Sequence, residues 1–244
     1  MLLFGITGPG HAQERNGMQL HTRRGFLLGA ARLSATSLLL PRDSSGETAP
    51  PQLSWERDHP ARLSWSTHLV AEVTAALSQL DAAQDIGSFF PSYDRVQQPI
   101  RAAMWAELVA LLAFFESAWE PCARYHEASL GIDTVTHQPV FSEGLLQLSY
   151  QDMEVYPDLP FNWEKDRRLS PTDCRKTILD PLKNLSAGLK ILSAQIQSAG
   201  RIVVKDNFYW STLADPAIAK HSRVERIRMI AARWAGGSGA TSPS

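Results

Sequence analysis

Apolar residues that recur at intervals of three and four constrain this chain more than any other feature of its sequence. Residues spaced in this way lie on one face of an α-helix, which can then pack on a core. The first stretch of this kind contains Leu69, Val73, Ala76, Leu77 and Leu80, and Gly87 and Pro91 follow it. Because the sequence has no internal repeat and no convincing run of alternating apolar and polar residues, it predicts a mainly α fold.

Three further helices are expected from the same spacing. The second covers residues 99–117 and starts with Pro99, which suits a first helical turn because the N–H groups there have no partner within the helix. The third covers residues 180–200, and the last covers residues 223–234. Their predicted buried positions are Ile100, Met104, Leu108, Leu111, Leu112, Phe115, Leu182, Leu185, Leu189, Leu192, Ile196, Val224, Ile227, Ile230 and Ala231.

The size and charge of the chain exclude some classes of protein. Its 244 residues, 44% of them hydrophobic, are enough for one sizeable core, so we expect one folded domain. Residues 1–48 hold five of the 24 basic and three of the 25 acidic residues, which leaves 19 basic and 22 acidic residues beyond them. This acidic balance argues against a nucleic-acid-binding protein.

The N-terminal part of the sequence resembles an export signal. Arg23 and Arg24 stand directly before an apolar stretch that runs to Leu40, as in twin-arginine signals. That stretch is shorter than the ~20 residues that cross a membrane. We therefore expect the twin-arginine export machinery as a partner and a periplasmic or secreted location, with the start at Met1 or Met18. The alternative is a cytosolic amphipathic helix with a chance pair of arginines.

Composition also predicts the organisation of the chain. Residues 41–62 are polar and rich in proline, which is typical of a linker. We assign residues 1–48 to the export signal and the start of the linker, 49–95 to linker and an N-terminal helix, 96–236 to the main folded domain, and 237–244 to a flexible tail.

A carboxylate at a helix end is the first candidate for chemistry, in the segment Phe114-Phe115-Glu116-Ser117-Ala118-Trp119-Glu120-Pro121. Poor solvation disfavours the anion, and the negative end of the helix dipole disfavours it further. Both effects raise the pKa of a carboxylate and keep it protonated near neutral pH, as protonation of a glycosidic oxygen requires. Glu116 is therefore the candidate catalytic acid.

A second candidate segment is Ser142-Glu143-Gly144-Leu145-Leu146-Gln147-Leu148-Ser149. Gly144 permits close approach of the backbone, and Gln147 is able to hydrogen-bond a sugar or the acid. Tyr209 and Trp210 are suited to stacking on a sugar ring, although burial in the core is the commoner use of such residues. The candidate substrate-binding residues are Ser117, Glu143, Gly144, Leu145, Gln147, Tyr209 and Trp210.

Three short segments together resemble the soluble lytic transglycosylases and the related goose-type lysozymes. They are Glu116-Ser117, Gly144-Leu145-Leu146-Gln147 and Asn184-Leu185-Ser186-Ala187-Gly188, within about residues 96–210. The resemblance implies a lysozyme-like helical domain with an active-site groove, and no cofactor. It also implies cleavage of the β-1,4 bond between N-acetylmuramic acid and N-acetylglucosamine, so the expected partners are peptidoglycan glycan strands. We expect a monomer.

The chain departs from these families near its C-terminal end and beside Gly144. Members often carry an Ala-x-Tyr-Asn segment whose Tyr helps to hold the acid, where this chain has Ala231-Ala232-Arg233-Trp234. The candidates to replace that Tyr are Tyr125, Tyr150, Tyr156 and Tyr209. Glu143 is the other departure, since many relatives have a small or apolar residue there.

The number of carboxylates at the site decides the expected product. The resemblance implies a transglycosylase, in which one Glu acts as acid and then as base and yields a 1,6-anhydro product. A hydrolase needs a second carboxylate ~5 to 9.5 Å from the first. Glu143 and Asp152 are candidates, with a solvated loop residue and a helix cap as their alternative roles. A non-catalytic peptidoglycan-binding scaffold is the alternative from another functional class.

Cys122 and Cys174 are the only two cysteines of the chain. In an exported protein we expect them to form a disulfide, and the alternative is two separate buried thiols. His126-Glu127 is half of a zinc motif without a second His on the following turn, so we expect no metal site. The sequence has no Gly-rich phosphate loop and no nucleophile elbow.

Overall fold

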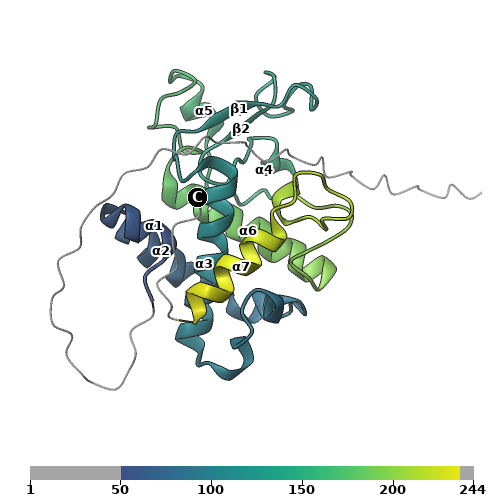
Figure 1. Ribbon diagram of the computed structural model, residues 1–244. Helices are drawn as coiled ribbons and strands as arrows, with labels where there is room; N and C mark the ends of the chain where they lie inside the picture. Colours follow the sequence, from purple (N-terminus) through teal and green to yellow (C-terminus); the bar gives the residue numbers. More distant parts are fainter. Residues whose placement is uncertain (1–50, 237–244) are drawn as a thin grey trace, which may run out of the picture.

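Helices make up most of residues 51–236, the part of the chain that this computed structural model describes (Figure 1). The α-helices are α1 Ser54–Asp58, α2 Leu63–Leu80, α3 Gln98–Ser117, α4 Asp152–Val155, α5 Trp163–Asp166, α6 Pro181–Ala199 and α7 Val224–Ala235. The 3-10 helices are η1 Pro60–Arg62, η2 Ile86–Ser88, η3 Tyr93–Arg95 and η4 Ser211–Leu213. The prediction of a mainly α fold is confirmed, and α3, α6 and α7 match their predicted bounds closely.

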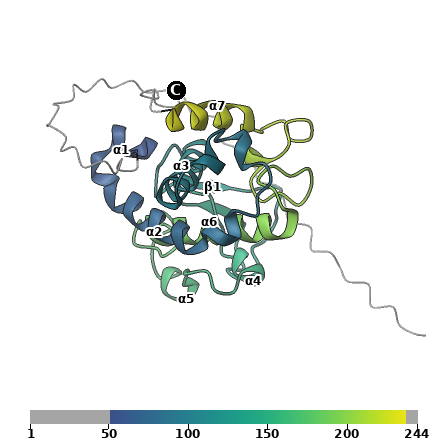
Figure 2. The same cartoon turned by 90° about the horizontal axis from the view of Figure 1, so that it is seen from below.

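Helix α3 lies at the centre of the molecule, with α2, α6 and α7 around it (Figure 2). The sequence analysis gave this helix one buried side, whereas nearly every residue from 102 to 113 is buried. A helix that is apolar all round belongs inside a protein, and the run of Ala, Leu and Val in this stretch is the signal for it. The outer helices present one apolar face each, as their spacing predicted.

Residues 54–58 and 60–62 are helical, which corrects the prediction of a linker over 41–62. Leu53 and Trp55 are buried, and the Trp55 indole donates a hydrogen bond of 2.7 Å to Ser66 Oγ on α2. Ser54 donates its backbone N–H to the Glu107 carboxyl inside α3 at 2.9 Å, and its hydroxyl bonds the same carboxyl. Apolar burial thus outweighs the local proline content. Residues 41–50 of that predicted linker lie outside the described residues.

Residues 118–180, which we call the connecting segment, join α3 to α6 and contain little regular structure. Strands β1 (Arg124–His126) and β2 (Phe141–Glu143) pair antiparallel, and they lie with α4 and α5 at one end of the helical part (Figure 1). The sequence predicted no strand, and a strand of three residues is too short to show alternation. Arg124 pairs with Glu143 in the register of the hairpin.

The paired arginines, the rest of the predicted export signal and the C-terminal tail lie outside the described residues. Within residues 51–236, no helix combines the length and the apolar character that crossing a membrane requires.

Candidate functional site

Glu116 lies in the last turn of α3 and is 3% exposed. The helix ends at Ser117, and the next two residues, Ala118 and Trp119, both adopt left-handed backbone conformations with φ of 52° and 62°. The Trp119 indole folds back and donates to Ala110 O at 2.7 Å, and its ring packs on Phe114. Left-handed conformations at two successive non-glycine residues are costly, and such strain concentrates at functional sites.

Ser117 joins the end of α3 to the second candidate segment. Its hydroxyl contacts two carbonyl oxygens, Ala113 O at 3.0 Å and Leu145 O at 2.9 Å. A serine four residues after Ala113 in a helix ordinarily bonds back to that carbonyl, but Leu145 is 28 residues away in the sequence. The Gly144–Gln147 turn is therefore held directly beside Glu116. Ser117 itself is buried, so its observed role is to connect the two segments.

Asn184 on α6 holds the same turn from the other side. This fully buried side chain accepts from Leu146 N at 2.8 Å and donates to Ile178 O at 2.9 Å and Glu143 O at 3.2 Å. Gly144 has φ of +79°, and a Cβ there would lie 2.3 Å from Asn184 Nδ2. Only glycine fits this position, because any side chain would displace the amide that organises the turn.

Leu146 completes the junction of the three sequence segments. A Cβ on Gly188 of α6 would lie 2.1 Å from Leu146 Cδ1, so the absence of a side chain there lets the leucine pack against the helix. The Trp210 indole donates to Leu146 O at 2.8 Å. The structure thus brings together the segments that begin at Glu116, Gly144 and Asn184, although they are far apart in the chain.

Tyr209 and Trp210 are not placed to stack on a sugar, which corrects that prediction. Trp210 is fully buried, and Tyr209 is 4% exposed. The Tyr209 hydroxyl donates to Asp152, which also accepts from Ser149 N at 2.7 Å. Asp152 is the first residue of α4 rather than its N-cap. These two aromatic residues pack and position the turn around residues 144–149 from within the core.

Glu143 is not the solvated loop residue that was the alternative prediction, because it is buried between two cations. Its Oε1 accepts from Lys176 Nζ at 2.6 Å and from Arg124 Nε at 2.9 Å. Lys176 is also buried, so the three side chains form an internal ion cluster with one more positive than negative charge. This arrangement opposes a role for Glu143 as a second catalytic carboxylate.

Cys122 and Cys174 form a disulfide with a Cα–Cα distance of 5.5 Å. Each cysteine lies two residues before one of the cations that bind Glu143, namely Arg124 and Lys176. The disulfide therefore links the two stretches of backbone that supply the cations of the ion cluster, beside the turn that carries Gly144.

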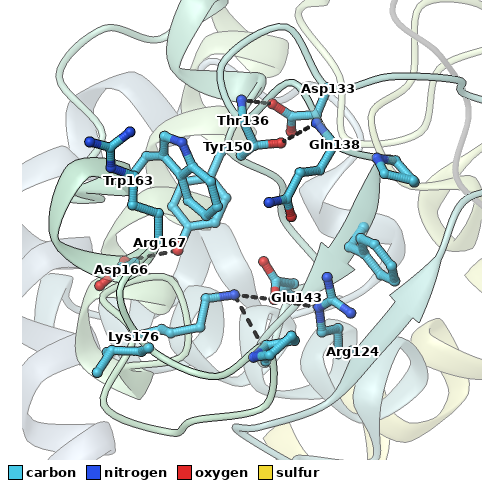
Figure 3. Close-up of a pocket in the computed structure, with 14 residues that line it drawn as sticks. Arg124, Asp133, Thr136, Gln138, Glu143, Tyr150, Trp163, Asp166, Arg167 and Lys176 are labelled. Atoms are coloured by element: carbon cyan, nitrogen blue, oxygen red, sulfur yellow. Dashed lines mark hydrogen bonds and ion pairs between the residues drawn. The ribbon is translucent and has the colours of Figure 1, made fainter.

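The ion cluster forms one side of a cavity of about 270 Å³ within the connecting segment (Figure 3). Tyr150 donates its hydroxyl to Asp166 at 2.8 Å; burial and this hydrogen bond raise the pKa of Tyr150, so it remains a donor. Other residues that line the cavity are Asp133, Thr136, Gln138, Phe141, Trp163 and Arg167. Glu116 does not line this cavity.

Glu127 is a buried carboxylate that the sequence analysis passed over. It is 5% exposed and accepts a hydrogen bond of 2.7 Å from Ser142 Oγ on β2. The sequence placed it next to His126 and so directed attention to zinc. Within residues 51–236, no three His, Cys, Asp or Glu side chains are grouped to hold a metal ion.

Comparison with known proteins gives a fold relationship. No protein-family model and no curated protein matches the chain. A glutamate-to-glutamine variant of Bd0314 DslA from Bdellovibrio is similar in structure, with a TM-score of 0.59 and 24% identity over 79% of this chain and 99% of that chain. Wild-type DslA gives 0.54 and 26% over 71% and 95%, and another glutamate-to-glutamine variant gives 0.55 and 25% over 73% and 97%. The chain and DslA share a fold.

Proposed function

We propose that this protein cleaves peptidoglycan glycan strands as a lytic transglycosylase, with Glu116 as the general acid and base at the β-1,4 bond. The observation that carries the proposal is the buried carboxyl of Glu116 at the C-terminal end of α3, held against the Gly144–Gln147 turn through Ser117. A general acid needs a poorly solvated position of this kind. The lysozyme-like domain with its groove is part of the same proposal.

The convergence of the three segments supports the proposal further. Their resemblance to transglycosylases rested on sequence order alone, and residues of each segment contact another segment in the structure. Gln147 has φ of 52° and donates to Gly144 O at 2.8 Å, so its side chain stabilises the turn. That a Tyr supports Glu116 stays a prediction. Of the four candidates, Tyr150 donates its hydroxyl to Asp166 and Tyr209 donates its hydroxyl to Asp152.

A lysozyme-type hydrolase is the second candidate function, because a second buried carboxylate is present. The two DslA variants replace glutamates eleven residues apart in that protein. Among the described glutamates of this chain, Glu116 and Glu127 have this spacing, as do Glu143 and Glu154. Glu154 is exposed and Glu143 is bound by two cations, so the first pair is the better candidate for chemistry.

Digestion of purified sacculi by the Glu116→Gln variant tests the proposal. The amide cannot donate a proton, so the rate should fall by about 10² to 10⁴-fold while the fold is retained. Glu154→Gln is the matched control, since the same change at an exposed site should leave the rate unaltered. Equal rates for Glu116→Gln and the parent protein would refute the assignment.

Mass spectrometry of the products separates the two candidate enzymes. A transglycosylase releases 1,6-anhydro ends and a hydrolase releases hydrated reducing ends. A parent protein that binds sacculi and releases neither product would be the non-catalytic scaffold instead. The proposed location is the periplasm or the cell exterior, which the disulfide supports because such bonds persist in oxidising compartments.

A further inference from the structure

The cavity in the connecting segment has a positive side and a negative side. On the positive side, Arg124 and Lys176 share a single oxygen of Glu143, which leaves a net charge of +1 at this cluster. On the opposite side of the view in Figure 3 lies Asp133, which is 2% exposed and has no ion-pair partner among the described residues. Its oxygens accept from the backbone N–H groups of Val135, Thr136 and Gln151.

The positive side has unused hydrogen-bonding capacity. Arg124 donates only its Nε to Glu143, so among the described residues its two terminal nitrogens have no acceptor. The side chain is 18% exposed, and its guanidinium lies 3.2 Å from the centre of the Phe141 ring, which restrains its orientation. A guanidinium with two parallel free N–H groups is the side chain best matched to a carboxylate.

The buried carboxylate oxygens around the cavity indicate that a ligand would also need a positively charged group. Glu143 is 2% exposed and uses Oε1 for both cations, while Oε2 has no hydrogen-bond donor among the described residues. Asp133 and Asp166 add two negative charges that no cation within residues 51–236 neutralises. Both carboxylates accept hydrogen bonds but have no cation as partner among the described residues, so a ligand that brings a positive charge to this side is favoured.

The formal charges of the side chains that line the cavity sum to zero, although they are unevenly placed, which disfavours a ligand with a large net charge. Three cations, Arg124, Lys176 and Arg167, line it together with the carboxylates of Asp133, Glu143 and Asp166. A ligand with net charge would gain on one side and lose on the other, whereas a neutral ligand with separated charges gains on both. The volume of about 270 Å³ lies below the range of roughly 300 to 1,000 Å³ that drug-sized ligands occupy.

We propose that this cavity binds the zwitterionic end of an amino acid, with its carboxylate at Arg124 and its ammonium on the side of Asp133. The side chain of the amino acid would lie against the Trp163 ring, which packs on Tyr150. The site is separate from Glu116 and does not depend on the proposed glycan cleavage. The zwitterion comes either from a free amino acid or from a branch of a polymer that carries an ammonium and a carboxylate on one carbon.

Calorimetric titration of the full chain with blocked and unblocked ligands tests both charges. The probes are alanine, N-acetylalanine without the ammonium, and alanine amide without the carboxylate. Each blocked probe should bind about tenfold more weakly or worse, because it loses one charge-assisted hydrogen bond to the cavity. Nα-acetyl-diaminopimelic acid, whose distal end remains zwitterionic, represents the polymer branch, and its affinity relative to alanine identifies the source.

Two variants connect any binding to the cavity. Arg124→Gln removes the guanidinium while Lys176 still neutralises Glu143, and Asp133→Asn removes the opposite charge while keeping an acceptor for the loop N–H groups. Each should weaken alanine or the branched probe about tenfold. The matched controls are Arg228→Gln and Asp158→Asn, which alter exposed ion pairs away from the cavity and should not change affinity.

Several outcomes would overturn the site. It is wrong if the blocked probes bind as well as the zwitterions, or if no zwitterion binds at up to about 10 mM. It is also wrong if N-acetylglucosamine binds, loses affinity in both variants and is not displaced by alanine, because the cavity would then be a sugar site. Should Asp133→Asn fail to fold, Arg124→Gln and the N-acetylated probe still decide.

Discussion

The helical part of the molecule and the connecting segment of residues 118–180 are stabilised by different interactions. Around α3 the contacts are apolar, with side chains such as Trp105, Leu108 and Leu111 fully buried, and burial of this kind contributes about 1.5 to 3 kcal/mol for each large side chain. The connecting segment joins the same core through side chains such as Leu146 and Phe161, and it adds a disulfide and an internal ion cluster, which the helical part lacks among the described residues. The candidate acid lies at the boundary between the two regions.

This difference explains why the boundary is a suitable place for a site. The apolar region supplies a rigid helix end, while the connecting segment supplies backbone turns and polar side chains beside it. A buried polar interaction needs both partners, since removal of one leaves the other buried without a hydrogen bond or an opposite charge. The connecting segment should therefore be more sensitive to single polar changes than the helical part.

Removing the disulfide should have the largest effect on stability. The cysteines are 52 residues apart, and opening a loop of that size is expected to cost about 4 kcal/mol. We expect the double variant Cys122→Ser, Cys174→Ser to unfold at a lower denaturant concentration than the parent. Added reductant should lower the unfolding midpoint of the parent and leave that of the double variant unchanged. An unchanged midpoint in the double variant would show that the bridge contributes little to the connecting segment.

Glu143→Gln should have the next largest effect, about 3 kcal/mol of destabilisation. The substitution leaves Lys176 buried without an anion, which is the costly way to break an internal ion pair. The control is Glu164→Gln, whose partner Arg167 is exposed, and it should cost less than about 1 kcal/mol. If chemical denaturation gives equal losses for the two variants, the ion cluster is not a structural element.

A buried carboxyl within the helical part, Glu107, predicts a pH dependence of the stability of the fold. Burial is the largest cause that raises the pKa of Glu107 from 4.5 to about 7. The folded state then binds more protons than the unfolded state. The contribution of protonated Glu107 to stability is therefore fully present below about pH 4.5 and is lost as pH rises through about 7. In Glu107→Gln this loss should be absent.

Urea unfolding of the parent and Glu107→Gln at several pH values measures the difference. We expect the stability of the parent relative to the variant to fall by on the order of 3 kcal/mol across that window. Groups common to both proteins cancel in this comparison. A constant difference between about pH 4.5 and 8 would contradict the raised pKa.

The two regions also differ in how well the sequence predicts them. Periodicity and end residues gave α6 almost exactly as found, since Asp180 and Gly200 mark its ends and apolar residues define its face. Side-chain contacts between distant segments were not predictable in this way. The ion pairs of Glu143 with Arg124 and Lys176 depend on how the chain turns, which no local pattern encodes.

The candidate site shows the same division. The poorly solvated position of Glu116 and the close backbone approach at Gly144 could be inferred locally, because one depends on a helix end and the other on the lack of a side chain. For Trp210 the sequence left both stacking on a ligand and packing in the core open, with core packing as the commoner use, and the structure shows burial. Glu127 was missed because its hydrogen bond comes from Ser142, on the other strand of the hairpin.

The smallest predicted effect concerns the boundary between the connecting segment and α6. Asp180 is the N-cap of that helix and accepts from Leu182 N at 3.0 Å and Lys183 N at 3.1 Å. Replacing an N-cap aspartate with alanine leaves these N–H groups without their acceptor and typically costs about 1 kcal/mol. Because Asn184 lies in the first turn of α6, the loss should also loosen the turn at Gly144.

Asp180→Asn separates these two consequences, because asparagine caps helices about as well as aspartate. We expect it to retain stability and Asp180→Ala to lose about 1 kcal/mol in urea unfolding. Hydrogen exchange at Leu146 N, which donates to Asn184, should accelerate in the alanine variant alone. If exchange at Leu146 is the same in both variants, the start of α6 does not control the turn, and the connecting segment is positioned by its own disulfide and ion cluster.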